Sequence, residues 1–452
     1  MQPLQYRQIF SFYWPLVLTS QMMTLAHPIV NAALGRSEGA IVQLAGYGVG
    51  FGLGVFLNSP LFPFQQSVAA LGVGPRSRRD LTRRVMVLAA AICAVELVLA
   101  LSPWGGALIG KLMGSTPAVT DLVRKILLVQ APIPLLLPLR SLAWGVIMRH
   151  RATRVISLAT ALRLTLLTVA VFALVGRGFL APAVIAGAAM TLAILVETLY
   201  SGRLAIRLVR AGAEGIDGPG DGPVGWGAFF GFVGPLMVST VTWSAMRPLI
   251  NAVIGRTGDP DLAQGGFGFV FPLLILMASP LWSLNNTALV LIRDRHDLRR
   301  VARFSAGAIL LFVALIGAWT WTPLRPWALA HIFALEADKA LYVTGALLLI
   351  PLQPIPLGLR SLSHGFLMNR RRTGVIATAS LIKTALIIAA GFGVVAAYPG
   401  VNGALLGTAL VMGGGFLETF MVGWGALRLH RDLIAASDRD VTPPPLMTEP
   451  LE

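Results

Sequence analysis

The chain has 452 residues, of which 56% are hydrophobic and only 12% are charged, and its mean hydropathy is +0.74. Soluble domains contain about 25% charged residues, so this composition excludes an ordinary soluble protein and indicates an integral membrane protein. The formal net charge of +16 would suggest nucleic-acid binding in a soluble protein, but the distribution of the basic residues argues against that function.

Apolar runs of roughly 20 residues recur from end to end, each long enough to cross a bilayer. We therefore predict an all-α integral membrane protein with about twelve transmembrane helices and no strands. The first run lacks a small-residue cleavage site, so we interpret it as a retained helix rather than a signal peptide. Cys93 is the single cysteine and lies within a predicted span, which rules out a disulfide framework.

Basic residues gather in every second connection between the predicted spans. These segments are 75–84, 149–154, 203–210, 293–303, 369–372 and 428–439. The positive-inside rule assigns such segments to the cytoplasmic side, so we expect a multi-pass protein of the cytoplasmic membrane with both termini in the cytoplasm. Topology thus accounts for most of the positive charge, and we predict no nucleic-acid partner.

The sequence repeats itself with a shift of 220 residues. The stretch HPIVNAALGR at 27–36 corresponds to RPLINAVIGR at 247–256, and LRSL at 139–142 recurs at 359–362. SPL recurs as well, Arg163 corresponds to Lys383, and VET is repeated as LET after one extra residue. We predict two six-helix lobes in the same orientation, related by a pseudo-twofold axis along the membrane normal.

Composition also predicts where the two lobes, the linker and the tail begin and end. We predict an N-lobe of six helices at 1–210 and a C-lobe of six helices at 227–436. Residues 211–226 are rich in Gly, Pro and Asp and are expected to form a cytoplasmic linker. Residues 437–452 are expected to form a disordered cytoplasmic tail.

Ionisable residues inside the predicted spans are the main functional signal. A charge at the bilayer centre costs roughly 2.5–3.5 kcal/mol, so each must face protein or water. Five basic residues outnumber three acidic ones, which argues for a polar cavity, lined from both halves, that attracts an anion. The residues are Arg140, Arg163, Arg247, Arg360 and Lys383 against Glu96, Glu197 and Glu418.

Helical spacing extends the set of candidate substrate ligands. Residues four apart share a helix face, and Arg offers a forked donor for carboxylate or phosphate while Lys offers a mobile point charge. For any single basic residue, an ion-paired or snorkelling side chain is the alternative, and His27 is either an interior hydrogen-bonded residue or a titrating group. The pairs are His27 with Asn31, Arg247 with Asn251, and Arg360 with His364.

The acidic residues are candidates for gating or coupling. Glu197 and Glu418 lie towards the cytoplasmic ends of the sixth and twelfth predicted helices. Three roles stay open for them: a salt bridge at an inner gate, acceptance of a coupling proton, or a lock within the bundle. Glu96 is the third gating or coupling candidate.

Prolines at corresponding positions predict helix breaks. An interior proline frees a carbonyl and bends its helix, and broken helices at matching positions of two repeats point to a transporter site. The alternative is ordinary tolerance of proline in membrane helices. The residues are Pro28 with Pro248 and Pro60 with Pro280.

Enzyme motifs are missing from the sequence. It contains no Walker loop, no clustered metal ligands and no nucleophile elbow, so we predict neither an enzyme nor a bound metal or cofactor. The glycines of 46–54 never complete a dinucleotide fingerprint, and we interpret them as helix-packing residues.

Several motifs resemble the progressive ankylosis (ANK) family, over most of the chain and most clearly in its second half. They are FYWPL (12–16), RPLINAVIGR (247–256), PIPLGLRSLSHGFL (354–367), VNGALLGT (401–408) and LETFMV (417–422). The resemblance implies a MATE-like fold, because this family is grouped with MATE exporters and lipid-linked-sugar flippases. It also implies export of pyrophosphate, citrate or nucleotides. The residues that match its motifs are Arg247, Pro248, Asn251, Arg256, Arg360, Gly365 and Glu418.

Our hypothesis is a secondary transporter that exports small polyanions of the citrate, pyrophosphate or nucleotide class. It would work by alternating access through a basic central cleft in the bilayer, with H⁺ or Na⁺ as the coupling ion. Three alternatives stay open: a MATE-like multidrug/cation antiporter, a flippase for lipid-linked precursors, and a non-transporting membrane scaffold.

Overall fold

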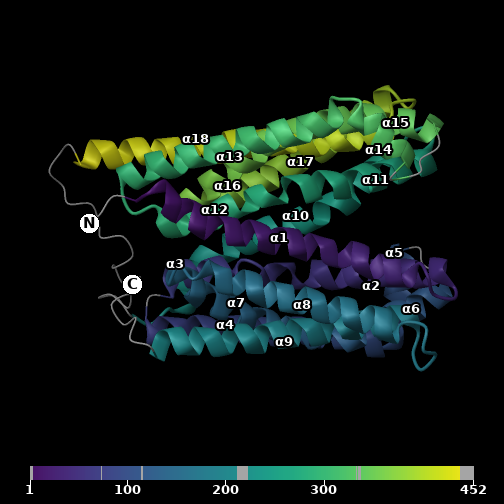
Figure 1. Cartoon of the computed structure of the whole chain (residues 1–452), viewed down its shortest axis with the longest axis horizontal. Helices are drawn as coiled ribbons and strands as arrows, with labels where there is room; N and C mark the ends of the chain where they lie inside the picture. Colours follow the sequence, from purple (N-terminus) through teal and green to yellow (C-terminus); the bar gives the residue numbers. More distant parts are fainter. Residues whose placement is uncertain are drawn as a thin grey trace. The chain divides into compact units, whose positions relative to one another are not determined.

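The structure is a computed structural model that describes residues 4–72, 74–113, 116–210, 222–331, 333 and 337–437. Within these residues the chain is helical and contains no strand, as predicted (Figure 1). The longer helices of the first half are α1 (Tyr6–Leu34), α2 (Ala40–Asn58), α4 (Pro75–Leu101), α6 (Pro117–Gln130), α7 (Ile133–Arg149), α8 (Thr153–Leu174) and α9 (Pro182–Arg210). Those of the second half are α10 (Trp226–Ile254), α11 (Pro260–Ala278), α13 (Arg295–Thr320), α15 (Ala337–Leu349), α16 (Pro354–Asn369), α17 (Gly374–Ala397) and α18 (Gly403–Ser437).

Shorter elements join these helices. They are η1 (Ser59–Leu61), α3 (Phe64–Leu71), α5 (Pro103–Met113), η3 (Ser279–Trp282), α12 (Ser283–Leu291), α14 (Leu324–His331) and η4 (Ile350–Leu352).

The described helices have the length and composition of membrane spans. Nine segments pass this test, and the number is eleven if each of two bent pairs, α6 with α7 and α15 with α16, is one span. Helix α1 is 29 residues long but is not among these segments, so the described helices give up to eleven spans where we predicted about twelve.

Residue contacts divide the chain into two compact units. Among the described residues, the N-unit covers 18–241 and the C-unit covers 4–17 together with 242–437. Helices α1 and α10 contribute to both units, whereas the predicted lobes begin at residues 1 and 227. The start of α1 belongs to the C-unit because Tyr13 Oη donates a hydrogen bond to the Pro280 carbonyl at 3.2 Å. Residues 211–221 and 438–452 lie outside the described residues, so the linker and tail stay predictions.

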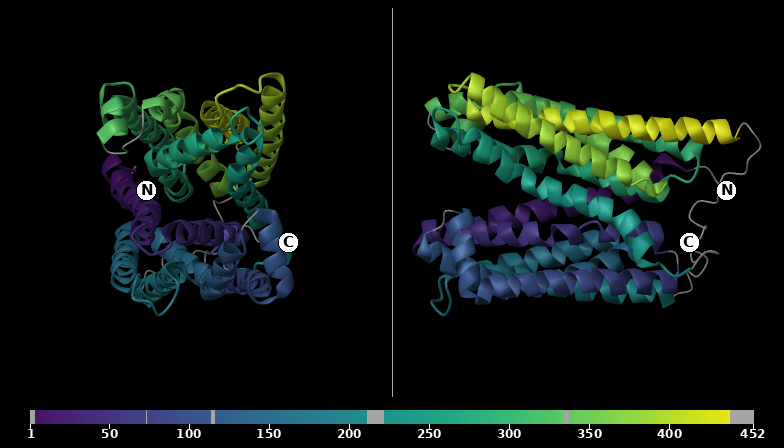
Figure 2. Two further views of the ribbon diagram at one scale, coloured as in Figure 1. Left: turned by 90° about the vertical axis from the view of Figure 1, so that its right-hand side faces the viewer. Right: turned by 180° about the vertical axis from the view of Figure 1, so that it is seen from behind.

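The helices of each unit form an elongated bundle (Figure 2), and the two bundles have the same internal contacts. In the N-unit, α7 packs against α9, α3 and α4, and in the C-unit the corresponding α16 packs against α18, α12 and α13. Two turns repeat in the same register: Arg151 has φ 55° and Arg371 has φ 56°. Non-glycine residues seldom adopt this conformation, so its recurrence 220 residues later indicates that the two sequence copies fold alike.

Two of the four predicted helix breaks are present. Pro60 lies in η1 between α2 and α3, and Pro280 lies in η3 between α11 and α12. By contrast, α1 and α10 continue through Pro28 and Pro248, so the breaks that we predicted there are wrong. A proline removes one backbone hydrogen bond without having to end the helix, and membrane helices tolerate that loss.

Glycine permits a close helix contact in the C-unit. A Cβ at Gly365 on α16 would collide with the Asn285 carbonyl and with Ala288 on α12. Gly145 on α7 has a similar environment against Val68 on α3. The recurrence of glycine after both LRSL sequences therefore has a packing cause.

We expect Gly365→Ala to destabilise the protein by about 1–3 kcal/mol, because overpacking forces α12 and α16 apart. Gly423→Ala is the matched control, since a Cβ at Gly423 meets nothing within 4 Å and the gain in helix propensity is the same. The measurement is the midpoint of thermal unfolding in detergent. Equal midpoints for the two variants would contradict the close-contact explanation.

Candidate functional site

Three helices of the N-unit meet at a buried carboxylate, in a group that we call the Glu197 cluster. Arg140 on α7 donates from Nη1 to Glu197 Oε2 on α9 at 3.0 Å. Arg163 on α8 has its Nε 3.6 Å from the same oxygen, and Thr160 donates to Glu197 Oε1 at 2.9 Å. The Glu197 side chain is fully buried, so these contacts replace its hydration and join α7, α8 and α9.

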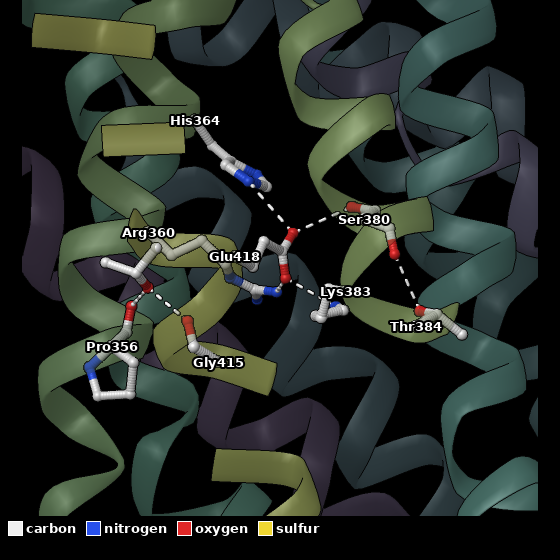
Figure 3. Close-up of polar contacts among 9 residues, drawn as sticks. Pro356, Arg360, His364, Ser380, Lys383, Thr384, Gly415 and Glu418 are labelled. Carbon is white, nitrogen blue, oxygen red and sulfur yellow. Dashed lines mark hydrogen bonds and ion pairs between the residues drawn. The ribbon is translucent and has the colours of Figure 1, made fainter. Parts of the chain in front are cut away.

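The C-unit contains the equivalent Glu418 cluster, shown in Figure 3. Arg360 on α16 and Lys383 on α17 approach Glu418 from opposite sides (Figure 3) and contact its Oε2 at 2.9 and 2.7 Å. Ser380 donates to Oε1 at 3.0 Å, and His364 Nε2 lies 3.5 Å from that oxygen. The predicted sharing of one helix face by Arg360 and His364 therefore brings both to the same carboxylate.

The two clusters occupy the same positions of the repeat. Their basic and hydroxyl residues are 220 apart and their glutamates are 221 apart. The sequence analysis missed the hydroxyl residues, although they follow the same shift and both donate to the glutamate. The corresponding pairs are Arg140 with Arg360, Thr160 with Ser380, Arg163 with Lys383, and Glu197 with Glu418.

An aromatic ring completes each cluster. In the C-unit, the Trp243 ring centroid lies 5.3 Å from Arg360 Cζ and 5.9 Å from Lys383 Nζ. In the N-unit, Arg140 Cζ lies 4.9 Å from the centroid of Trp144. Such cation–π contacts favour the charged form of the base in a partly desolvated site.

These contacts correct one expectation from the sequence. We interpreted the basic residues as the lining of an anion-attracting cavity and kept ion pairing as the alternative, yet all four contact a carboxylate of their own unit: Arg140, Arg163, Arg360 and Lys383. A buried charge without a partner is costly, which explains the pairing. The basic side chains are still in excess, however, because one carboxylate serves two of them in each cluster.

Some donors of the Glu197 cluster have no acceptor in the described part of the chain. Arg163 is 5% exposed, and its Nε and Nη2 make no hydrogen bond there. Its charge is close enough to act on His27 and Tyr47, and Tyr47 Oη also has no partner. Sequence reasoning found Arg163 and His27 but assigned the stretch around Tyr47 to helix packing alone.

Arg247 has a different environment from the clustered cations. Its side chain is exposed, with Cζ 5.5 Å from the centroid of Phe271, and no carboxylate among the described residues pairs with it. The carbonyls of Asn31 and Asn251 accept from the glycine amides four residues later, at 2.8 and 2.9 Å. No hydrogen bond between described residues joins either Asn side chain to a cluster, so their role as ligands stays a prediction.

Glu96 on α4 is a buried carboxylate without a cation. It is 0% exposed, its Oε1 accepts from Asn58 Nδ2 at 2.6 Å, and its Oε2 has no hydrogen-bond partner in the described residues. The shift of 220 residues aligns Glu96 with Ile316 and Asn58 with Ala278. This pair therefore belongs to one copy alone.

We expect Glu418→Gln to destabilise the protein by about 3–5 kcal/mol, because it leaves two buried cations and His364 without their carboxylate. The control is Asp121→Asn, which removes a largely exposed ion pair with Lys125 and should cost little. Thermal unfolding in detergent measures both. If the two variants unfold at the same temperature, the Glu418 cluster does not stabilise the C-unit.

The chain matches a family model, that of the progressive ankylosis protein (ANKH), over residues 4–259. This is more than half of the chain. The match lies mainly in the first copy, which corrects our expectation that the likeness would be clearest in the second half.

Solved structures with the same fold are MATE transporters and a related protein. The eukaryotic MATE transporter AtDTX14 has 13% identity and a TM-score of 0.70, over 93% of this chain and 95% of that one. An outward-facing multidrug resistance MATE family transporter of the MOP superfamily has 15% identity and a TM-score of 0.69, over 94% and 96%. A MOP superfamily transporter from Pyrococcus furiosus, described as having a binding pocket of reverse polarity, has 15% identity and a TM-score of 0.67, over 95% and 96%.

At these low sequence identities the structural similarity establishes the fold alone, whereas the match to the family model establishes the family. The chain has the fold of the MATE transporters and belongs to the progressive ankylosis protein (ANKH) family.

Proposed function

We propose that this protein is a transporter of the MATE/ANKH type that exports small polyanions of the citrate, pyrophosphate or nucleotide class. Its family and its fold support transport. The observation that carries the anionic substrate is the excess of basic side chains, with one carboxylate for two of them in each cluster. The basic segments of the sequence support the cytoplasmic membrane as its location, with cytoplasmic termini.

Arg163 is the clearest candidate ligand of the N-unit. Its Nε and Nη2 make no hydrogen bond among the described residues, although Nε is 3.6 Å from Glu197 Oε2. A guanidinium binds carboxylate or phosphate oxygens with two parallel hydrogen bonds. In a buried site such bonds are stronger than in water. An anion at Arg163 would satisfy donors that the described protein groups do not satisfy.

The shared glutamates suggest how binding drives the cycle. A polyanion that binds Arg140 or Arg163 competes with Glu197 for the same guanidinium groups, and the same competition applies to Glu418 in the C-unit. The glutamates then serve as internal substitutes for the substrate when the site is empty. We propose that this exchange accompanies alternating access through a basic central cleft.

Arg247 is our candidate for a fixed substrate ligand, because it is exposed and without a carboxylate partner in the described chain. His27 stands at its position in the first copy and lies near Arg163. At this position of the repeat, the second copy therefore has a permanent charge and the first copy has a titratable group.

A second candidate function is multidrug or cation antiport, and Glu96 is the observation that favours it. A buried carboxylate without a cationic partner is a plausible cation ligand. We instead propose that Glu96 binds the coupling ion, a proton, because its Oε2 is buried, has no hydrogen-bond partner among the described residues and can accept one. The reverse-polarity relative also indicates that this fold accommodates more than one pocket polarity.

We expect Arg247→Gln to lower polyanion transport by roughly tenfold or more, as one charge-assisted contact contributes about 1.5–3 kcal/mol. Uptake of labelled citrate, pyrophosphate and ATP into proteoliposomes is the measurement. Arg428→Gln is the matched control, because Arg428 is also exposed and also lies over an aromatic ring, Trp424. Full activity of Arg247→Gln would remove Arg247 from the site, and ethidium transport without polyanion transport by the unmodified protein would favour cation antiport.

We expect Glu96→Gln to abolish proton movement linked to transport, while exchange of the polyanion down its gradient continues. The substitution keeps the size of the side chain and its hydrogen bond with Asn58 but removes the titratable group. A pH-sensitive dye in proteoliposomes reports the proton, and a sodium gradient at equal pH tests Na⁺ instead. Cys93→Ala, one turn away on α4, is the control. Unchanged proton movement in Glu96→Gln would exclude Glu96 as the coupling group.

A further inference from the structure

A large groove lies on the N-unit, outside both charge clusters. Its floor is α7, and its walls are the beginning of α4 and the end of α9. The volume is about 1280 Å³. Both walls contact α7, with which they form the groove.

The C-unit has a second groove of about 450 Å³ at the same positions of the repeat, over α16 and between α13 and α18. Thr198 and Gly202 in the first groove correspond to Thr419 and Gly423 in the second. Both copies therefore retain the same surface depression. A chance irregularity of packing would not recur at matching residues of two independently diverged sequences.

The inner part of the N-unit groove is apolar. Leu139 on the floor and Leu199 and Ile206 on the α9 wall are all more than 40% exposed. In a membrane protein such side chains face lipid tails. From Thr198 to Arg210 the α9 wall extends roughly 18 Å, at about 1.5 Å per residue, which is enough to hold much of an acyl chain.

The end of the N-unit groove is strongly basic. Six arginines and one aspartate line it. Asp80 is already bonded, since its Oδ2 accepts from the Val224 amide at 3.2 Å. Five of the arginines are exposed in the described structure, and they come from the helix ends that the positive-inside rule assigns to the cytoplasm: Arg76, Arg79, Arg83, Arg203 and Arg210.

The two grooves differ in charge at the same positions. Arg78 in the first corresponds to Leu298 in the second, and Arg203 corresponds to Trp424. The tryptophan ring replaces a charge and fills space, which accounts for part of the smaller volume. Only the N-unit groove combines an apolar channel with a basic end.

We propose that the N-unit groove is a binding site for an anionic phospholipid. Its acyl chains lie along α7 and α9, and its phosphate is bound by the arginines at the ends of α4 and α9. Basic pockets between transmembrane helices on the cytoplasmic side have the chemistry that recognises such headgroups. The proposal concerns lipid binding and does not depend on which substrate the protein transports.

The test is native mass spectrometry of the full-length protein after delipidation and titration with phosphatidylglycerol or phosphatidylcholine. We expect phosphatidylglycerol to bind more tightly to the unmodified protein. The double variant Arg79→Gln/Arg83→Gln should weaken that binding roughly thirtyfold, at about 1 kcal/mol for each arginine near the membrane surface. Both side chains are exposed, so folding should be unaffected.

The repeat provides the matched control, Arg299→Gln/Arg303→Gln. These arginines occupy the same positions of α13, are also exposed, and do not line the second groove. Equal losses in the two double variants would mean general attraction to a basic surface and would overturn the proposal. Equal affinity of the unmodified protein for the two lipids would overturn it too.

A second variant tests the groove itself. A Cβ at Gly202 meets nothing within 4 Å, so Gly202→Leu fills the groove without a clash in the described structure. We expect it to reduce phosphatidylglycerol binding at least tenfold, whereas Gly393→Leu, at another open glycine, should leave binding unchanged. Unaltered binding in Gly202→Leu would show that lipid does not occupy the groove.

Discussion

The central interaction of this protein is the sharing of one buried carboxylate by two cations on neighbouring helices. Glu197 joins α7, α8 and α9, and Glu418 joins α16, α17 and α18. A single carboxylate lowers the cost of burying the cations without cancelling their charge. The same contact therefore stabilises each bundle and leaves each cluster with more basic side chains than carboxylates, which is the excess on which our proposal of anion transport rests.

The duplication gives the two copies the same architecture, and the residues at which they differ give each copy different chemical groups. The clusters, the grooves and the left-handed turns recur in register. Glu96 has no acidic counterpart, since Ile316 takes its position, and His364 stands where the first copy has Trp144. A carrier with identical halves would have no preferred site for a coupling ion. Such asymmetric residues are where direction and coupling can be specified.

Much of this architecture was predictable from the sequence, because apolar length and a repeat held in register are strong signals. The cations were found for the same reason: charge inside a span is rare. Ion pairing was kept as an alternative, but the partners could not be identified, since Arg140 and Glu197 are 57 residues apart and only helix packing brings them together. The prolines show a second feature of the structure that the sequence alone did not determine. Pro60 and Pro280 interrupt their helices while Pro28 and Pro248 do not, and that difference depends on neighbouring contacts that the sequence does not display.

The surplus charge also constrains the transport cycle. If a polyanion displaces a glutamate from its guanidinium partners, the released carboxylate is left in a poorly hydrated site, which is unfavourable unless it finds a hydroxyl, a proton or another base. Thr160 and Ser380 already donate to the glutamate oxygens that the arginines do not occupy. His364 adds a titratable neighbour in the C-unit alone. In the cycle that we propose, the return of each glutamate to its cations therefore favours substrate release.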